Sequence, residues 1–313
     1  MINKKRIIFM GTPDFAVPSL KALHDTGHEV VLVVTQPDRP KGRGQKVYFS
    51  PVKEAALKLG YEILQPSSVR SSEFYEKAAS LYPDIFVVIA FGHILPKKIL
   101  SIPKDCAINL HASLLPKYRG PAPIQWAIIN MEHETGVTAM LMDEGLDTGN
   151  ILLSAKTEIS SKETSSSLHD RLSRIAGDLL IQTLSDMSKN SIKPVPQENS
   201  LATYAPMLKK KDGLIDWSKP AEETEAFIRG MTPWPGAFTF IGKKRLKIFA
   251  SDVVFSDSKE APGTVTGEAR DVLHVATGKY LLSVKEIQQE SGKRLYIKDY
   301  LSGSNISPGT VLG

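Results

Sequence analysis

Residues 84–90, Asp-Ile-Phe-Val-Val-Ile-Ala, form the most apolar short run in the chain and constrain its fold most strongly. A continuous apolar run of this length, rich in β-branched residues, is typical of a strand buried on both faces of a parallel sheet. Two similar runs, residues 6–10 and 30–34, are separated by a helical pattern. The sequence therefore predicts an α/β fold with a Rossmann-like, mostly parallel sheet.

The turn after the first strand argues against a dinucleotide cofactor. Gly11 closes this strand, and Thr12 is expected to cap a helix that has Pro13 at its first position. A dinucleotide-binding turn needs three glycines at fixed spacing, and this turn has only Gly11. We therefore expect neither NAD nor a flavin.

Apolar periodicity predicts the remaining elements of an α/β domain at residues 1–188. Residues 36–46 between two of them contain two prolines, two glycines and four basic residues, and are expected to form a long loop. Helices are expected over residues 51–59, 74–79, 124–131 and 166–187, and strands over residues 136–142 and 150–158.

A change in composition marks the end of the α/β domain. Residues 189–206 are rich in Asn, Ser and Pro, which is typical of a semi-rigid linker. Residues 207–313 then combine one short helix, at 221–229, with several short strands at turn-rich spacing, which predicts a small OB-like β-barrel domain. These strands are expected near Phe238 and over residues 246–253, 263–266, 272–276 and 281–286.

Composition excludes several classes of protein. The single Cys106 cannot form an intramolecular disulfide, and no apolar run approaches the roughly 18 residues that a membrane span requires. The apolar N-terminal residues 7–10 are too few for a signal peptide. We therefore expect a cytoplasmic, soluble protein. Its net charge of +5, from 39 basic and 34 acidic residues, permits an anionic partner without requiring one.

The candidate chemistry lies in residues 109–116, Asn-Leu-His-Ala-Ser-Leu-Leu-Pro. Side chains alternate along a strand, so Asn109, His111 and Ser113 should project from one face. Open α/β sheets bind their ligands at the carboxyl ends of strands, where this stretch is expected to lie. A hydrogen-bonded histidine in the core is the alternative interpretation.

Residues 143–149 place three carboxylates and two glycines in one turn, which ordinary turn chemistry could also explain. An Asn, a His and an Asp together can stabilise a tetrahedral intermediate at a carbonyl, because the carboxamide and a protonated imidazole both donate to the oxyanion. Asp147 would orient the imidazole, favour its charged form and accept the proton that the nucleophile releases.

Two other chemistries have weaker support. A serine hydrolase using Ser113 and His111 lacks the Gly-x-Ser-x-Gly turn. A metal site built from His111, Asp143 and Asp147 has no recognisable ligand spacing, so we expect no metal. Acyl transfer between two bound substrates needs neither a protein nucleophile nor a metal.

Basic residues are concentrated in three stretches. The loop at residues 36–46 carries two Arg and two Lys that suit contacts with phosphates. Residues 209–211 are three lysines, and residues 243–247 read Lys-Lys-Arg-Leu-Lys. Such runs are more often solvated faces than binding sites, and both interpretations stay open from composition alone.

The chain resembles the methionyl-tRNA formyltransferase family over essentially its whole length. His-x-Ser-Leu-Leu-Pro is common to the wider group that uses 10-formyltetrahydrofolate, and Ala112 stands where many relatives have glycine. The motifs that carry the resemblance are Phe-Met-Gly-Thr-Pro-Asp-Phe at 9–15, Thr-Gln-Pro-Asp-Arg-Pro at 35–40, Gly-Arg-Gly at 42–44, the stretch at 109–116, Gly-Leu-Asp-Thr-Gly at 145–149 and Asp-Trp-Ser at 216–218.

The resemblance implies transfer of a formyl group from 10-formyltetrahydrofolate to the methionine of initiator methionyl-tRNA, by direct attack of the α-amine. It implies Asn109, His111 and Asp147 as catalytic residues. Ser113 is also expected to belong to the turn that fixes the first two. Folate contacts are expected from Phe91, Gly92, Ile94, Leu95, Ser113, Leu114, Leu115, Pro116 and Asp143, and tRNA contacts from Arg39, Lys41, Arg43, Lys46, Lys209, Lys210 and Lys211.

We expect a monomer that has no membrane partner. Two other acceptors, glycinamide ribonucleotide and a nucleotide-linked amino sugar, are formylated by related N-terminal domains, but neither explains a basic loop together with a separate small barrel. An RNA-binding protein with an inactive core is a further alternative. The intact Asn109, His111 and Asp147 argue against it.

Overall fold

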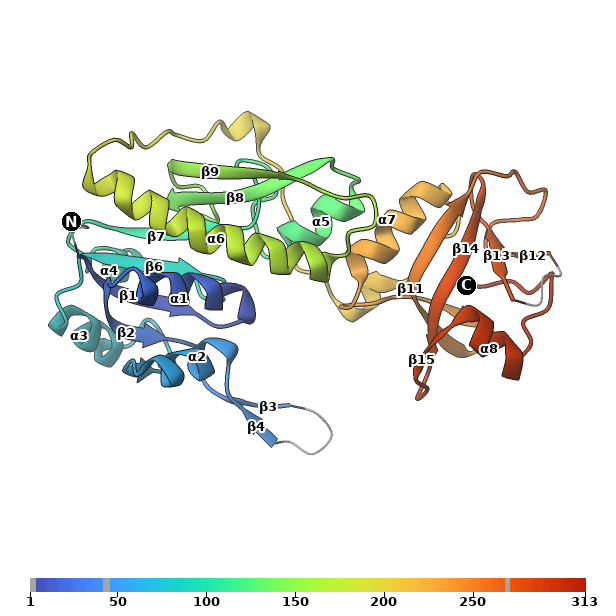
Figure 1. Ribbon diagram of the computed structural model, residues 1–313, viewed down its shortest axis with the longest axis horizontal. Helices are drawn as coiled ribbons and strands as arrows, with labels where there is room; N and C mark the ends of the chain where they lie inside the picture. The colour runs from blue at the N-terminus through green and yellow to red at the C-terminus, as the bar shows by residue number, and fades with distance from the viewer. Residues whose placement is uncertain (1–3, 42–45, 268–270) are drawn as a thin grey trace. The chain divides into compact units, whose positions relative to one another are not determined.

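The computed structural model describes residues 4–41, 46–267 and 271–313, with the backbone alone at 39–41 and 46–47 (Figure 1). The chain divides into two compact units. The first comprises Met1–Pro123, Glu134–Glu158 and His169–Ala205, and the second comprises Ile124–His133, Ile159–Leu168 and Pro206–Gly313. No helix in the described ranges is both long enough and apolar enough to cross a membrane.

The first unit is built on a seven-stranded sheet of order β5-β2-β1-β6-β7-β8-β9 (Figure 1). The five strands from β5 to β7 pair in parallel, whereas β8 and β9 are antiparallel. The predicted Rossmann-like, mostly parallel sheet is therefore confirmed. The strands are β1 (Arg6–Gly11), β2 (Glu29–Val34), β5 (Ile63–Leu64), β6 (Ile85–Ile89), β7 (Cys106–His111), β8 (Glu134–Leu141) and β9 (Ile151–Glu158).

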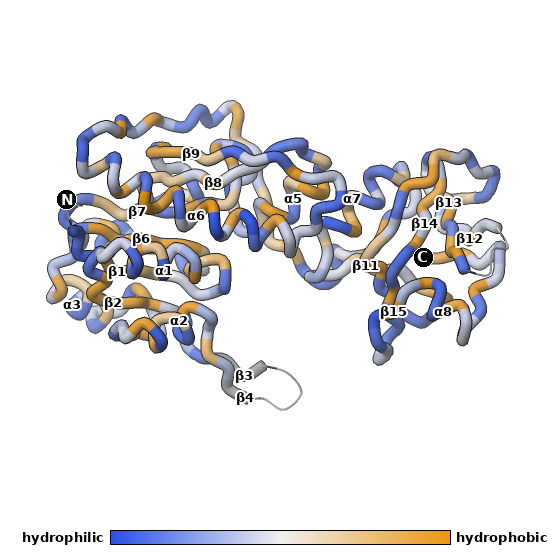
Figure 2. The backbone as a smooth tube through the Cα atoms, viewed as in Figure 1, coloured by the Kyte–Doolittle hydropathy of each residue, from blue (hydrophilic) through white to orange (hydrophobic). Residues whose placement is uncertain are grey.

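The apolar runs become central strands because both of their faces are buried. Every residue of β6 is buried, and β6 lies between β1 and β7. Ile8 and Met10 of β1 share a core cluster with Phe74 and Ala78 of α3, so the alternate residues of β1 project to the opposite face of the sheet. Figure 2 shows the hydrophobic residues gathered along the sheet. This packing holds the carboxyl ends of β6 and β7 in place.

Six described helices lie between residues 17 and 188; all of α5 but Pro123, and the first four residues of α6, fall in the second unit. The helix expected at residues 51–59 has those bounds, because the Ser50 side chain caps its start and Gly60 ends it with φ +76°. The six are α1 (Val17–Asp25), α2 (Pro51–Leu59), α3 (Ser72–Ser80), α4 (Lys97–Leu100), α5 (Pro123–Ile129) and α6 (Ser165–Ser188).

The predicted cap at Thr12 is wrong. A short 3-10 turn, η1 (Asp14–Ala16), precedes α1, which begins at Val17 and receives no side-chain cap. The Thr12 hydroxyl donates instead to the Phe91 carbonyl (3.3 Å) and accepts from the Gln36 amide (3.4 Å). Thr12 therefore links three strand ends rather than starting a helix.

The predicted structureless loop at residues 36–46 is also partly wrong. The chain forms a two-stranded hairpin of β3 (Arg39–Lys41) and β4 (Lys46–Tyr48), in which Pro40 is opposite Val47. Proline and basic side chains conceal this short pairing in the sequence. Arg43, between the strands, lies outside the described residues.

The second unit contains a curled antiparallel sheet that forms a half-barrel, which confirms the predicted small β domain. Its order is β10-β11-β14-β13-β12, with β15 also paired to β14, and isolated bridges join Leu312 to Ile241 and Val311 to Thr264. Its elements are η3 (Lys210–Gly213), α7 (Ala221–Met231), β10 (Ala237–Ile241), β11 (Lys244–Val254), β12 (Val265–Thr266), β13 (Leu273–Ala276), β14 (Leu281–Gln289), β15 (Arg294–Tyr296) and α8 (Ile297–Gly303).

Candidate active site

Asn109 and His111 lie at the carboxyl end of β7, where neighbouring strands fix the backbone on both sides. Asn109 is opposite Val88 of β6 and Met140 of β8 in the sheet. The two polar side chains are two residues apart along the strand, so they project from the same face. His111 is 7% exposed, which places its imidazole in a largely dry environment.

The structure brings Asp147 to both of these side chains. Asn109 Nδ2 donates to Asp147 Oδ1 over 3.4 Å, and His111 Nδ1 lies 3.6 Å from Asp147 Oδ2. The backbone N–H of Gly120 also donates to Asp147 Oδ2, at 2.8 Å. The three side chains predicted to be catalytic therefore meet, although they are separated by up to 38 residues in the chain.

The hydrogen bonds of His111 determine which of its nitrogens faces Asp147. Nε2 lies 2.8 Å from the carbonyl oxygen of Tyr118, which can only accept, so Nε2 carries a hydrogen. A neutral imidazole would then direct the lone pair of Nδ1 toward a carboxylate. When Nδ1 also carries a proton, it faces the Asp147 carboxylate as a donor.

Asp147 is held in a conformation that residues other than glycine rarely adopt. Its φ is +54°, in the left-handed region. Gln197 Nε2 donates to the carbonyl oxygens of Asp147 (2.9 Å) and Gly149 (2.8 Å), and so clamps both sides of the turn. A Cβ at Gly149 would come within 1.7 Å of the Leu141 carbonyl oxygen, so only glycine fits there. The surrounding contacts therefore determine where this carboxylate lies.

Arg119 holds the Gln197 side chain in place. It is 3% exposed, and its guanidinium donates to Gln197 Oε1 from Nε (3.0 Å) and Nη2 (2.7 Å), and to Asn199 Oδ1 (2.9 Å). These acceptors are neutral amides. A buried cation is costly unless its donors are satisfied, and these hydrogen bonds satisfy the guanidinium while they hold the Gln197 side chain.

The same contacts change the interpretation of residues 189–206, which were expected to be a spacer. Val195 exchanges backbone hydrogen bonds with Ile151, and Thr203 and Ala205 exchange them with Arg119. The segment is therefore attached to the first unit along much of its length. Sequence reasoning missed Gln197 because an amide in a Pro- and Asn-rich stretch carries no distinguishing pattern. The sequence feature that could have indicated this contact was Arg119, which lies in a stiff loop with glycine and proline residues around it.

Ser113 belongs to the turn after β7. Its hydroxyl donates to the Lys117 carbonyl (2.6 Å), and its own carbonyl accepts from the Thr138 hydroxyl (2.7 Å). Thr138 Oγ1 in turn accepts from the Leu115 amide (3.2 Å). The Ser113 hydroxyl is thus directed into the turn rather than toward His111, which argues against the hydrolase interpretation. Thr138 was not predicted.

The side chains predicted to contact folate have different environments. Phe91 and Leu95 are buried in the core cluster, whereas Gly92 and Ile94 are exposed, Ile94 to 64%. Asp143 Oδ1 accepts from the Gly145 amide and the Thr148 hydroxyl, so it also performs ordinary turn chemistry. Leu115 is buried, and Leu114 and Pro116 are half-buried.

The predicted tRNA-binding lysines of the second unit are all exposed. Lys209 precedes η3, and Lys210 and Lys211 lie in it. Arg39, Lys41 and Lys46 belong to the β3–β4 hairpin, where the structure describes the backbone alone. The hairpin lies in the first unit, as do the predicted catalytic side chains. The three lysines lie in the second unit.

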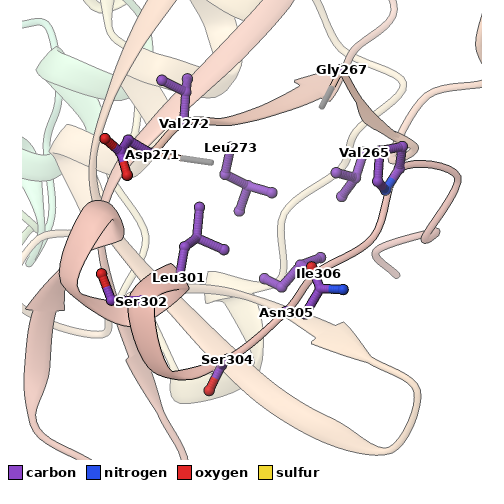
Figure 3. A pocket seen from close by; sticks show the side chains of 11 residues that line it. Val265, Gly267, Asp271, Val272, Leu273, Leu301, Ser302, Ser304, Asn305 and Ile306 are labelled. Carbon is purple, nitrogen blue, oxygen red and sulfur yellow. The ribbon is translucent and has the colours of Figure 1, made fainter. Parts of the chain in front are cut away.

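A hollow of about 530 Å³ in the second unit contains none of the predicted site residues. Figure 3 shows Val265, Leu273, Leu301 and Ile306 directed toward its interior. Asp271 lies at its margin, so its charge does not suit an anionic ligand. In the described part of the chain, no cluster of three or more His, Cys, Asp or Glu side chains is arranged to hold a metal ion.

Comparisons with known proteins identify the family. The formyl transferase family model matches residues 5–184, and the formyl transferase C-terminal domain model matches residues 207–305. The methionyl-tRNA formyltransferase of Citrifermentans bemidjiense is 51% identical over 308 residues, which are 98% of this chain and 96% of the relative. The chain belongs to the methionyl-tRNA formyltransferase family. It is therefore a formyl-transferring enzyme, and the family predicted from the motifs is confirmed.

A second relative supports this assignment, and solved structures share the fold. The methionyl-tRNA formyltransferase of Caldanaerobacter subterraneus subsp. tengcongensis is 49% identical over 98% of this chain and 99% of its own length. An N-formyltransferase from Helicobacter canadensis, in complex with folinic acid and dTDP-3-aminofucose, has a TM-score of 0.67 at 21% identity, covering 91% of this chain and all of that one.

HypX from Aquifex aeolicus, in complex with tetrahydrofolic acid, has a TM-score of 0.63 at 17% identity and covers 96% of this chain and 47% of that one. At such identities, the two solved structures show a shared fold and nothing more. The family assignment rests on the relatives of about 50% identity.

Proposed function

We propose that the chain transfers the formyl group of 10-formyltetrahydrofolate to the α-amino group of methionine on initiator methionyl-tRNA. Relatives of about 50% identity over nearly the whole chain support this acceptor. The observation that carries the chemistry is the convergence of Asn109, His111 and Asp147 at the end of β7. The folate supplies the formyl group when it is bound.

Asn109 and His111 act as hydrogen-bond donors to the formyl oxygen as negative charge develops on it. Tyr118 occupies His111 Nε2, so the donor is Nδ1, on the side of Asp147. The Asn109 carboxamide has a second N–H hydrogen besides the one directed at Asp147. Preorganised donors in a water-poor site commonly provide the largest single contribution to acyl transfer.

Asp147 has two roles in this proposal. Its carboxylate orients the imidazole of His111 and accepts the proton that the attacking amine releases, directly or through water. A free α-amino group has a pKa of roughly 8, so much of the nucleophile is already neutral near physiological pH. A strong general base is therefore unnecessary, and Asp147 mainly needs to be in the correct position.

The residues near this site are chemically suited to a flat, largely apolar folate ring. Ile94 and Leu146 expose large apolar side chains on the two loops expected to form the pocket. The proposed folate contacts are Phe91, Gly92, Ile94, Leu95, Ser113, Leu114, Leu115, Pro116 and Asp143. Because Phe91 and Leu95 are buried in the core, they would contribute backbone atoms and shape rather than exposed side chains.

The proposed tRNA contacts come from the β3–β4 hairpin and from η3. Lys209, Lys210 and Lys211 present three exposed cations that suit phosphates. Lys53 Nζ, which donates to Asp38 Oδ2 at 2.5 Å, fixes the first residues of the hairpin segment to α2. The segment that leads into the hairpin is therefore anchored, and Arg39, Lys41, Arg43 and Lys46 are the tRNA contacts that we propose from it.

The decisive experiment offers 10-formyltetrahydrofolate together with charged initiator tRNA, charged elongator tRNA or small amines, and measures which of them is formylated. We expect the methionine of initiator tRNA to be modified fastest. Formylation of amino sugars or ribonucleotide amines, with no modification of charged tRNA, would overturn the acceptor but leave the formyl transfer intact. The absence of any folate-dependent formylation would overturn both.

A further inference from the structure

A pocket of about 170 Å³ lies beside the turn between α7 and β10 in the second unit. Two aromatic and three cationic side chains contribute to its walls, and none of the described residues that line it carries a carboxylate. The lining residues are Lys210, Pro233, Trp234, Pro235, Phe238, Arg245 and Lys247. Such a combination suits a ligand that is both aromatic and anionic.

Trp234 is unusually exposed for a tryptophan. It is 51% exposed, whereas Trp217 in the same unit is 5% exposed and donates to the Thr239 hydroxyl (3.1 Å). Pro233 and Pro235 flank Trp234, and Gly236, with φ +89°, donates to the Met231 carbonyl to close the turn. The turn thus holds an indole ring in solvent, an arrangement typical of binding surfaces.

The strand register explains why the cations gather here. Lys247 is opposite Phe238, and Arg245 is opposite Phe240, so these four residues share one face of the β10–β11 pair. Leu246, between the two cations, is buried on the other face. Composition alone does not decide whether residues 243–247 are a solvated face or a binding site. The strand pairing places two of their cations, Arg245 and Lys247, in the wall of the pocket.

Arg245 already makes the kind of contact that a base would make. Its Cζ lies 4.0 Å from the centroid of the Phe238 ring, so its charge lies over an aromatic face. Phe238 is buried, but Trp234 remains open to solvent. A second aromatic ring could therefore stack on the indole while its attached anion lies near Arg245 and Lys247.

We propose that this pocket binds one nucleotide in an unpaired part of the tRNA, with its base stacked on Trp234 and its phosphate near Arg245, Lys247 and Lys210. The proposal rests on the proposed function, because the tRNA is the nucleic acid that the enzyme would meet. The pocket is too small for a duplex, and a base can stack on a side chain only when it is not paired within a helix. The contact is therefore independent of phosphate binding along a helical stem.

The test compares Trp234→Ala with Tyr296→Ala, which removes another exposed aromatic residue of the same unit. Equilibrium binding of uncharged initiator tRNA and the kinetics of its formylation when charged are measured on the full chain. Trp234→Ala should raise Kd and KM by about 10-fold or more with little change in kcat. Tyr296→Ala should change none of these values.

The cations are tested in the same way with Arg245→Ala and Lys298→Ala, the latter an exposed lysine on α8. Arg245→Ala should weaken tRNA binding and lower the slope of log Kd against log salt by about one, because one fewer phosphate is neutralised. Trp234→Ala should weaken binding without changing that slope. This difference separates stacking from phosphate contact.

Trp234→Phe guards against a variant that fails to fold, because it keeps an aromatic face. It should restore most of the binding, and a short single-stranded oligonucleotide should quench the fluorescence of the wild-type chain more than that of Trp234→Phe. The proposed nucleotide binding would be overturned if folded Trp234→Ala bound tRNA with the Kd of the wild type. Equal quenching of the wild-type chain and of Trp234→Phe would also overturn it. Failure of the wild-type chain to formylate charged tRNA would overturn the proposed function instead.

Discussion

The site at the end of β7 and the Trp234 pocket represent two ways of using polar and aromatic side chains. At β7, His111 is buried, Asn109 and Asp147 are partly buried, and their polar atoms have partners: His111 contacts a carbonyl and a carboxylate, and Asp147 accepts from a backbone N–H. At Trp234, a half-exposed indole ring lies with three cationic side chains in the wall of a pocket. Chemistry requires donors fixed before the reaction, whereas recognition of a large anion requires an accessible surface.

This comparison predicts that substitutions in the two regions will affect different kinetic parameters. Removal of a fixed donor should lower kcat, because the donor acts mainly as charge develops. Removal of an exposed contact should raise KM, because the contact is the same before and during the reaction.

The largest effect is expected at Asn109 and His111. Asn109→Ala and His111→Ala should each lower kcat by about 100-fold or more, as loss of an oxyanion donor does elsewhere, with little change in tRNA affinity. Steady-state kinetics and equilibrium tRNA binding measure the two quantities. Weaker tRNA binding with unchanged kcat would show that these side chains hold substrate rather than stabilise charge.

A smaller but substantial effect is expected at Gln197. Gln197→Leu removes both donors that clamp the Asp147 turn, and it removes the Gln197 acceptor of the buried Arg119, which keeps its contact with Asn199. We expect kcat to fall by about 10-fold or more and the free energy of unfolding by about 1–3 kcal/mol, the cost of leaving a buried polar group unsatisfied.

Gln197→Glu separates these two effects, because it keeps an acceptor for Arg119 but removes the donors to Asp147 and Gly149. Its stability should stay close to that of the wild type while kcat remains low. Ser200→Ala, three residues away on an exposed part of the same segment, is the matched control. Equal kcat in Gln197→Glu and the wild type would mean that the clamp does not position Asp147.

The sequence predicts well those features that repeated local patterns specify. The apolar run of β6 and the capped helix at Pro51–Leu59 appear as expected, because burial and capping act over a few residues. The partners Asn109 and His111 are also visible, because they lie two residues apart on one strand. The carboxylate-rich turn made Asp147 a candidate partner, and the family resemblance implied that the three side chains act together.

The features that the sequence did not predict depend on distant contacts. Thr12 links strand ends instead of capping a helix, because the Phe91 carbonyl and the Gln36 amide provide its partners. Gln197 becomes important only because the chain returns to within hydrogen-bonding distance of Asp147, 50 residues earlier. The cations of residues 243–247 likewise acquire a common face only when β11 pairs with β10.

The predicted phosphate contact of Arg43 offers a milder test of the difference between the two kinds of substitution. Arg43→Ala should weaken tRNA use several-fold and lower the slope of log Kd against log salt by about one, without changing folate binding. Titration of tRNA binding at several salt concentrations measures this slope. An unchanged slope would assign Arg43 a role other than contact with phosphate.

The smallest effect is expected at the ion pair that anchors the β3–β4 hairpin. Lys53 Nζ donates to Asp38 Oδ2, Gln65 Nε2 donates to Asp38 Oδ1, and both charged side chains are less than one-fifth exposed. The hydrogen bond from Lys53, followed by that from Gln65, lowers the pKa of Asp38. A lowered folded-state pKa means that this stabilisation is complete above the unfolded-state pKa of about 4 and is lost as the pH falls through the folded-state value.

Asp38→Asn should therefore destabilise the protein by at most about 1 kcal/mol at pH 7 and by progressively less below pH 4. Thermal unfolding of the two chains at pH 7 and at pH 3.5 measures the difference. A difference that grows as the pH falls would contradict the sign of the shift. If Asp38→Asn also raises KM for tRNA at pH 7 with kcat unchanged, the anchored base of the hairpin contributes to tRNA recognition. Recognition would then depend, as catalysis does, on side chains that their neighbours hold in place.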